Sequence, residues 1–167
     1  MKLPRQAPLP ALAVPAFDWF ARRAALLLSA PIGLVSLVDV HGQVWPGAFG
    51  LPEPWAAQRA TPLSHSFCQH VVAAGRPFLV PNAQEHPLVA RNEAVIDLGV
   101  VAYAGVPLTL GGTSPGALSA IDQRPRRWTQ RQLADLQQLA DLCSDVLRRR
   151  LTLQQPPATS PAPRPTG

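Results

Sequence analysis

Residues 101–122 read VAYAGVPLTLGGTSPGALSAID, and this stretch decides the fold. It contains two apolar runs of strand length, Tyr103 to Leu110 and Ala117 to Ile121. Gly111 and Gly112 stand between them, and paired glycines supply the positive φ angles that a tight connection between antiparallel strands requires. The stretch therefore predicts a β-hairpin, closed on its second side by Gly116.

Further strands are predicted nearer the N-terminus. Ile32 to Val38 (IGLVSLV) is rich in β-branched residues and too short for a core helix, which indicates a buried strand. Turn residues follow at 39–42, and Gln43 to Phe49 can return as a second strand. Pro46 has no amide proton, so this second strand should lie at a sheet edge or end early. Phe78 to Val80 is predicted as a short strand.

Three helices are predicted from apolar spacing and capping residues. Ala16 to Ser29 has apolar residues at intervals of three and four, and Ser64 can cap a helix that runs to Gly75. Thr129 with Gln132 three residues later forms a capping box, and the helix behind it should continue to about Leu151. The order of helices and strands indicates an α+β sheet with a long helix at each end.

The prolines indicate where the domain ends, and the cysteines indicate its redox environment. The chain has 167 residues, 20 prolines and two cysteines. We expect Pro-rich tails at 1–15 and 153–167, the second of them disordered, around one domain at 16–152. Cys68 and Cys143 stand in unrelated contexts, which favours free thiols in a reducing cytoplasm.

The distribution of charge and of apolar residues argues against two classes of partner. The formal net charge is +5, but the acidic residues outnumber the basic ones between 31 and 122. The arginines cluster instead in the flanking segments, where solvated helix ends commonly carry them. We therefore expect no nucleic-acid partner. No apolar run approaches the roughly 20 residues that span a bilayer, so no membrane partner is expected either.

Several segments, taken in order, resemble a GAF domain. The resemblance covers about Phe17 to Leu151, and no single motif decides it. The segments that carry it are IGLVSLVD (32–39), FGLPEPW (49–55), SHSFCQHVV (64–72), VAYAGVPL (101–108) and GALSAID (116–122).

The resemblance implies a mostly antiparallel sheet of roughly six strands. The first and last helices would cover one face, while the middle helix and loops would enclose a small-molecule pocket on the other. It also implies a non-catalytic sensory or regulatory domain of bacterial signal transduction, acting through its terminal helices on a partner protein or in a homodimer. The alternative is a ligand-free scaffold for dimerisation or docking. The sequence names neither the ligand nor any cofactor.

Five residues are the pocket candidates that follow from the implied fold. They are Phe67, Cys68, Asp97, Tyr103 and Ser119. Asp97 stands in a mostly apolar run, where a carboxylate needs a partner. It can meet a ligand amine or hydroxyl, cap a helical turn, or face water. Tyr103 can place its hydroxyl in the pocket or pack as a core aromatic residue.

Cys68 allows more than one chemistry. A thiol at a helix N-terminus can be a redox sensor or a nucleophile, whereas a buried cysteine usually acts as a small hydrophobic residue. Methionine sulfoxide reductases of the same family use several cysteines, and Cys68 lacks a resolving partner in the sequence. His65, Cys68 and His70 cannot converge on one metal ion from a continuous helix, so we expect no metal site.

Overall fold

The structure is a computed structural model that describes residues 13–154. Most of the predicted tail residues, 1–12 and 155–167, lie outside the described residues. In chain order the elements are α1 (Pro15–Leu27), β1 (Ile32–Val38), β2 (Gln43–Phe49), α2 (Trp55–Gln58), β3 (Ala60–Thr61), the 3₁₀ turn η1 (Leu63–His65), α3 (Cys68–Ala74), β4 (Phe78–Val80), the 3₁₀ turn η2 (Ala83–Glu85), α4 (Glu93–Asp97), β5 (Ala102–Leu110), β6 (Thr113–Asp122) and α5 (Gln130–Gln154).

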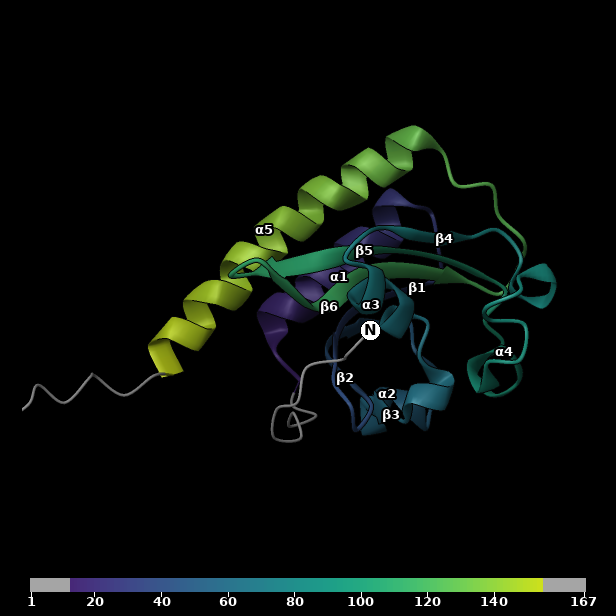
Figure 1. Cartoon of the computed structure of the whole chain (residues 1–167), viewed down its shortest axis with the longest axis horizontal. Helices are drawn as coiled ribbons and strands as arrows, with labels where there is room; N and C mark the ends of the chain where they lie inside the picture. Colours follow the sequence, from purple (N-terminus) through teal and green to yellow (C-terminus); the bar gives the residue numbers. More distant parts are fainter. Residues whose placement is uncertain (1–12, 155–167) are drawn as a thin grey trace, which may run out of the picture.

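The strands form a single sheet in the order β3-β2-β1-β6-β5-β4 (Figure 1). Every neighbouring pair is antiparallel. The predicted hairpin is confirmed as β5–β6, and its turn passes through Gly111 and Gly112 at φ angles of 54° and 80°. The six-stranded α+β architecture expected from the family resemblance is confirmed as well.

Pro46 is accommodated at an irregularity of the sheet. The register between β1 and β2 shifts between Val35 and Leu37, opposite the Pro46 region, which is where a strand tolerates a residue without an amide proton. The carbonyl of Pro46 accepts a hydrogen bond from the amide of Val14 at 2.8 Å, which fixes the entry to α1. β2 therefore keeps its full predicted length instead of ending early.

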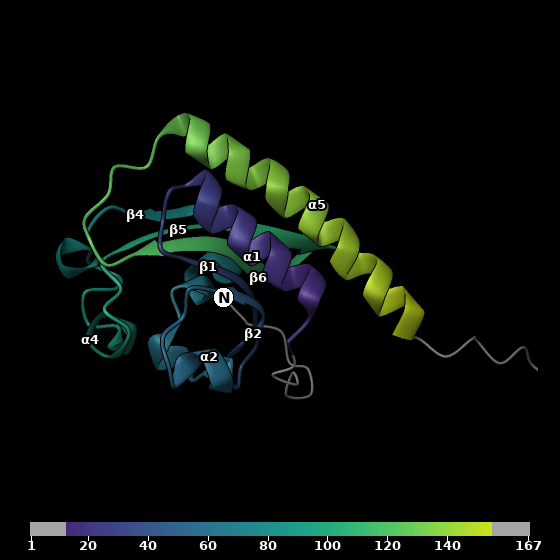
Figure 2. The ribbon, with the colours of Figure 1, turned by 180° about the vertical axis from the view of Figure 1, so that it is seen from behind.

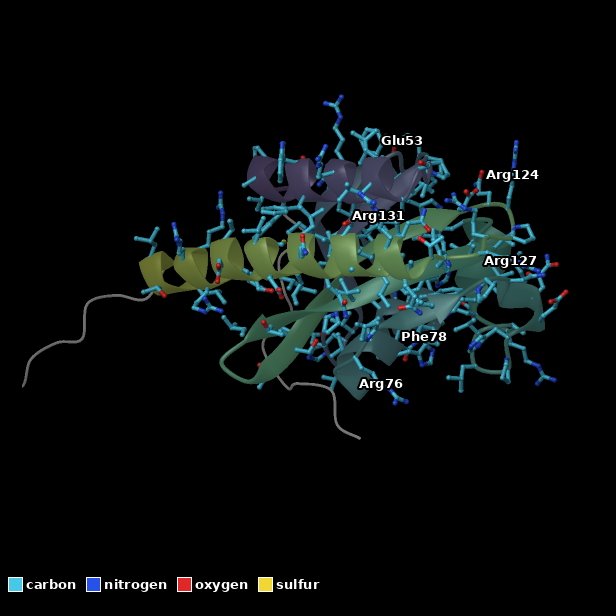
Figure 3. The ribbon with its side chains drawn as sticks, turned by 90° about the horizontal axis from the view of Figure 1, so that it is seen from above. Glu53, Arg76, Phe78, Arg124, Arg127 and Arg131 are labelled. Atoms are coloured by element: carbon cyan, nitrogen blue, oxygen red, sulfur yellow. The ribbon has the colours of Figure 1, made fainter. Side chains whose placement is uncertain are left out.

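Helices α1 and α5 lie side by side on one face of the sheet (Figures 2 and 3). The backbone of α1 comes so close to the sheet that a side chain at Gly33 would overlap the carbonyl of Ala21, and one at Gly47 would overlap the carbonyl of Phe17. The two helices and the sheet enclose one apolar core. Its members include Phe20, Leu28, Val106, Leu118, Leu136 and Leu147.

The start of α5 has the predicted capping box. The Thr129 hydroxyl accepts from the amide of Gln132 at 3.1 Å, and the Gln132 side chain accepts from the amide of Thr129 at 3.0 Å. Trp128 and Leu133 both pack against the apolar core, as a hydrophobic staple requires. The helix continues past its predicted end at Leu151 to Gln154.

Part of the basic segment before α5 is structural. Arg126 donates to the carbonyls of Leu28 at 2.6 Å and Ser29 at 3.0 Å, and to Asp122 at 2.7 Å, so it ties the end of α1 to β6. Arg124 and Arg127 lie beside it at the end of the molecule where α5 begins (Figure 3). Between residues 13 and 154, no helix combines the length and apolar character needed to cross a membrane.

The predicted helix from Ser64 to Gly75 is wrong in its first turns. Residues 63–65 form the 3₁₀ turn η1, Ser66 is extended with φ −99° and ψ 119°, and α3 begins only at Cys68. The cause lies in β2, because the Ser66 hydroxyl donates to the side chain of Gln43 at 2.8 Å while it accepts from the amide of Gln69. This break in the chain separates His65 from the helix that carries Cys68.

Candidate functional site

α3, α4 and their loops lie on the face of the sheet opposite α1 and α5 (Figure 1). A small, partly open cavity lies between this layer and the sheet. Its floor consists of strand residues and its roof of residues from 51–100. The floor residues are Ile32, Leu34, Gln43, Trp45, Tyr103 and Ile121, and the roof residues are Leu51, His65, Phe67, Cys68, Ala94, Leu98 and Val100. The volume is about 20 Å³, which is room for about one water molecule.

A string of hydrogen bonds crosses the buried region beside this cavity. The Tyr103 hydroxyl donates to the Cys68 sulfur at 3.2 Å, and the Cys68 thiol donates to the Ser36 hydroxyl at 3.2 Å. The Tyr103 ring lies over Gly105, where any side chain would overlap its hydroxyl. The position of the ring, and with it part of the cavity floor, therefore depends on a missing side chain at 105.

Burial determines the chemistry of Cys68. The residue is 2% exposed, and burial raises the pKa of its thiol despite the hydrogen bonds that it makes with Ser36 and Tyr103. Burial likewise raises the pKa of the Tyr103 hydroxyl well above 10. Desolvation opposes the formation of thiolate more strongly than the start of α3 favours it. Of the alternatives for Cys68, the structure supports a thiol that acts as a small buried group.

Two buried polar atoms have no hydrogen-bond partner among the described residues, the indole nitrogen of Trp45 and the hydroxyl oxygen of Ser119. Trp45 is 1% exposed and lines the cavity. Ser119 is fully buried on β6, close enough to Cys68 and Tyr103 to lower the pKa of both, but without a hydrogen bond of good geometry. An unpaired buried donor or acceptor costs about 1–3 kcal/mol.

His65 connects the cavity roof to α4. Its Nε2 lies 2.8 Å from a carboxylate oxygen of Asp97, and its Nδ1 lies 3.2 Å from Glu93 and 3.0 Å from the Ser64 hydroxyl. The ring of Trp55 covers it at a centroid distance of 5.6 Å. The Asp97 carboxylate thus meets a histidine of the protein, which was not among the partners expected for it.

Ser64, His65 and Asp97 have the residue types of a hydrolytic triad, but their geometry does not suit that role. The Ser64 hydroxyl donates to the Glu93 carboxylate at 2.7 Å, so its proton is directed away from the imidazole that would have to accept it. Glu93 and Asp97 stand at the two ends of α4. The cluster is better described as an attachment of α4 to η1.

Further hydrogen bonds attach the roof near Ser66. The side-chain amide of Asn92 donates to the Ser66 carbonyl at 3.2 Å, and Asn92 also accepts from the amide of Ala94 at the start of α4. Below them, Gln43 donates to Thr61 at 2.7 Å. Polar side chains, several of them exposed, therefore attach the five-residue helix α4 at its edge, while Ala94, Val95 and Leu98 join the apolar cluster beneath it. Because α4 is short, opening it exposes less apolar surface than unfolding the sheet would.

The structure brings most of the predicted site residues together. Phe67, Cys68 and Tyr103 line the cavity, Ser119 lies beside Cys68 and Tyr103, and Asp97 lies at the outer end of the roof with His65. Trp45 also lines the cavity, although its place in the sequence did not assign it to the site. Neighbouring residues of a strand point to opposite faces of a sheet, so the sequence places Trp45 and Val44 on different faces. It does not say which of the two faces carries the pocket and which carries the helices.

A larger hollow of about 390 Å³ lies at the β1–β2 turn, lined by residues that include Leu37, His41 and Val44. The Asp39 carboxylate there accepts from the amides of His41 at 2.7 Å and Gly42 at 3.2 Å, so it stabilises the turn. None of the unpartnered buried atoms of the described residues belongs to this hollow. We therefore assign the candidate site to the smaller cavity between the sheet and the roof.

The chain matches one protein family and several solved structures. The model of the GAF domain family matches residues 14–147. No curated protein matches the chain. Among solved structures, the blue-light absorbing form of the PixJ GAF domain of Thermosynechococcus elongatus is 22% identical, with a TM-score of 0.68 over 83% of this chain and 86% of that one. The GAF domain of an Acinetobacter phosphoenolpyruvate-protein phosphotransferase is 16% identical, with a TM-score of 0.68 over 83% of each chain. A domain of a two-component sensor histidine kinase from Sinorhizobium meliloti, described as putative, is 17% identical, with a TM-score of 0.64 over 83% and 93%. These structures share the fold.

Proposed function

Because the chain belongs to the GAF domain family, we propose that it is a non-catalytic sensory domain of bacterial signal transduction. It binds a small molecule in the cavity between the sheet and the roof formed by α3 and α4. The family supports a regulatory role, and the similar structures include a PixJ GAF domain in its blue-light absorbing form and a domain of a protein described as a putative sensor histidine kinase. Ligand binding and the route of the signal rest on the geometry of this chain.

The observation that carries the proposal is a mostly apolar cavity, one of whose lining residues, Trp45, has a buried hydrogen-bond donor without a partner in the described part of the chain. The buried indole N–H of Trp45 has no acceptor among the described residues. Leaving a buried donor without a partner destabilises the fold. A domain used only as a scaffold has no use for such a donor, whereas a binding site uses it to orient its ligand. The cavity of about 20 Å³ is too small for an organic molecule, so the ligand enters when α4 moves away.

A route for the signal runs through the sheet itself. Ile32 and Leu34 of β1 face the cavity, whereas Gly33 and Val35, which alternate with them, face α1. Because α1 touches the strand backbone at Gly33, a small displacement of β1 by a ligand must move the helix or strain it. Ligand binding on one face thereby changes the position of α1 and α5 on the other.

The terminal helices offer a surface to a partner. Trp19 and Leu26 of α1 are each 56% exposed, and Leu142 of α5 is 58% exposed. Exposed apolar side chains on neighbouring helices suit a second copy of the chain or a signalling protein. The output of the domain is a change at this helical surface.

A second candidate function is the ligand-free scaffold. The small volume of the cavity favours it, because a domain that only docks or dimerises needs no space between sheet and roof. Its interface would be the same helical surface. The two functions differ in whether a molecule is retained under α4.

Native mass spectrometry of the freshly purified full chain separates the two functions. A sensor shows a small non-covalent adduct that is missing from the denatured mass. The adduct is lost when Ala94 in the roof is replaced by phenylalanine, and it is retained when the exposed Ala134 of α5 receives the same replacement. Bare dimers in all three samples would support the scaffold and contradict the sensor.

A further inference from the structure

The polar atoms around the cavity are almost all engaged within the protein. Gln43 bonds to Thr61 and Ser66, Tyr103 bonds to Cys68, and His65 bonds to Asp97. A ligand that used any of these groups would have to break an existing hydrogen bond. The indole N–H of Trp45 is the one buried donor of the cavity lining that lacks a partner among the described residues.

The charges around the cavity exclude ionic ligands. Its lining contains no arginine, lysine, aspartate or glutamate. Outside the roof, Glu93 and Asp97 are directed at the two nitrogens of the His65 ring, so an anion approaching the cavity meets two carboxylates. A cation inside it would have no counter-ion. Burying an unpaired charge in such a site is strongly unfavourable.

The remaining lining is aliphatic and aromatic. Ile32, Leu34, Leu98, Val100 and Ile121 surround the ligand with carbon atoms. Such a surface stabilises a ligand by burying its apolar area, and it provides no hydrogen-bond partners for additional polar groups on the ligand. The chemistry of the ligand follows from this surface together with Trp45, the one residue of the described lining whose buried donor lacks a partner.

We propose that the ligand is a neutral, largely apolar molecule with one hydrogen-bond acceptor, which accepts from the indole N–H of Trp45. This inference rests on the proposed sensory function, because it specifies what the cavity under α4 binds. A ketone, an ester or an ether of modest size has this chemistry, whereas phosphates, nucleotides and carboxylic acids do not.

Three probes that share a six-membered carbon ring test the inference on the full chain, and the two neutral ones are closely matched in size and shape. Cyclohexanone is neutral and has one acceptor, methylenecyclohexane replaces that oxygen by carbon, and cyclohexanecarboxylate carries an anion. Binding is followed through the indole N–H resonances of ¹⁵N-labelled protein, with the Trp45 resonance assigned from a Trp45→Phe variant. We expect cyclohexanone to bind, to shift the Trp45 resonance, and to bind about tenfold more tightly than methylenecyclohexane. The carboxylate should not bind.

Variants remove the donor without changing the probes. In Trp45→Phe, we expect the affinity for cyclohexanone to fall to that for methylenecyclohexane, while methylenecyclohexane binds as before. The matched control is Trp19→Phe on the exposed face of α1, which should leave both affinities unchanged. The comparison of the two neutral probes on the unmodified protein decides the question even where Trp45→Phe fails to fold.

Each other outcome overturns a defined part of the reasoning. Equal affinity for the two neutral probes would show that the Trp45 donor selects nothing. Tightest binding of cyclohexanecarboxylate would contradict the neutral ligand and leave the sensory function intact. No binding of any probe, together with a bare native mass, would overturn both the inference and the proposed function.

Discussion

Replacing Gly105 by alanine forces the Tyr103 ring out of its position in the cavity floor. The new Cβ would overlap the tyrosine hydroxyl and lie 2.5 Å from Cζ and 2.6 Å from Cε1. The ring is fully buried and packs against Phe67 at a centroid distance of 5.3 Å, and the adjoining cavity of about 20 Å³ is too small to receive it. Overpacking of this kind costs about 1–3 kcal/mol. Loss of the Tyr103–Cys68 hydrogen bond adds about 1 kcal/mol.

Urea denaturation measures the consequence. We expect Gly105→Ala to reduce the free energy of unfolding by about 2–4 kcal/mol, and Thr109→Ala on the exposed side of the same strand to reduce it by less than about 1 kcal/mol. Tyr103 is the only tyrosine, so the ultraviolet absorbance of the phenolate reports this side chain alone. In Gly105→Ala the displaced ring should ionise at lower pH than in the unmodified protein. Unchanged stability together with an unchanged titration would refute the argument that Gly105 positions the ring.

Other expected results follow from burial and capping. Burial raises the pKa of Cys143 from 9.0 to about 12, so its thiol ionises at lower pH in the unfolded chain than in the folded one. The stability that this thiol contributes below pH 9 should therefore be lost as the pH rises toward 12. In Cys143→Ala the decline of the free energy of unfolding over this range should be less steep. Neither Cys68 nor Cys143 should react with a disulfide reagent at neutral pH until the protein unfolds, and rapid labelling of the native chain would contradict the burial of both. Thr129→Ala removes the cap of α5 and should cost about 1 kcal/mol in urea denaturation, a cost that Thr152→Ala near the other end of the helix should not show. Asp97→Asn weakens the attachment of α4 to His65, so amide exchange over 93–98 should accelerate while exchange over 102–110 stays unchanged.

The parts of the fold that the sequence predicted are those set by neighbouring residues. The β5–β6 hairpin needs only two apolar runs and the glycines between them, and the capping box of α5 needs only Thr129 and Gln132. Both signals lie within a few residues of the structure they produce, so they could be recognised without knowledge of the fold.

The parts that the sequence did not predict depend on contacts between distant residues. Ser64 has a capping residue type, but the chain after it is extended because Ser66 bonds to Gln43, which is 23 residues away. Asp97 meets His65 across 32 residues, and nothing near either residue in the sequence marks the other as its partner. The two-residue strand β3 exists only because β2 lies beside it.

The same limit applies to the site. Phe67, Cys68 and Tyr103 could be assigned to the cavity through the family resemblance, which fixes the face of α3 and β5 that they occupy. Trp45 could not, because the irregular pairing of β1 with β2 decides which face its indole takes. The donor on which the ligand inference depends was therefore visible only in three dimensions.

Residue-resolved hydrogen exchange of the full chain tests most directly whether α4 is a roof that opens over a closed site. We expect the amides hydrogen-bonded within 93–98 to exchange at least about tenfold faster than those of β5, because α4 is a helix of five residues whereas β5 lies inside the sheet between β6 and β4. The exchange of 93–98 should remain faster in Trp19→Phe, where the site is untouched. Protection of α4 equal to that of β5 would mean that the roof opens only when the whole domain unfolds, and it would contradict a ligand site beneath it.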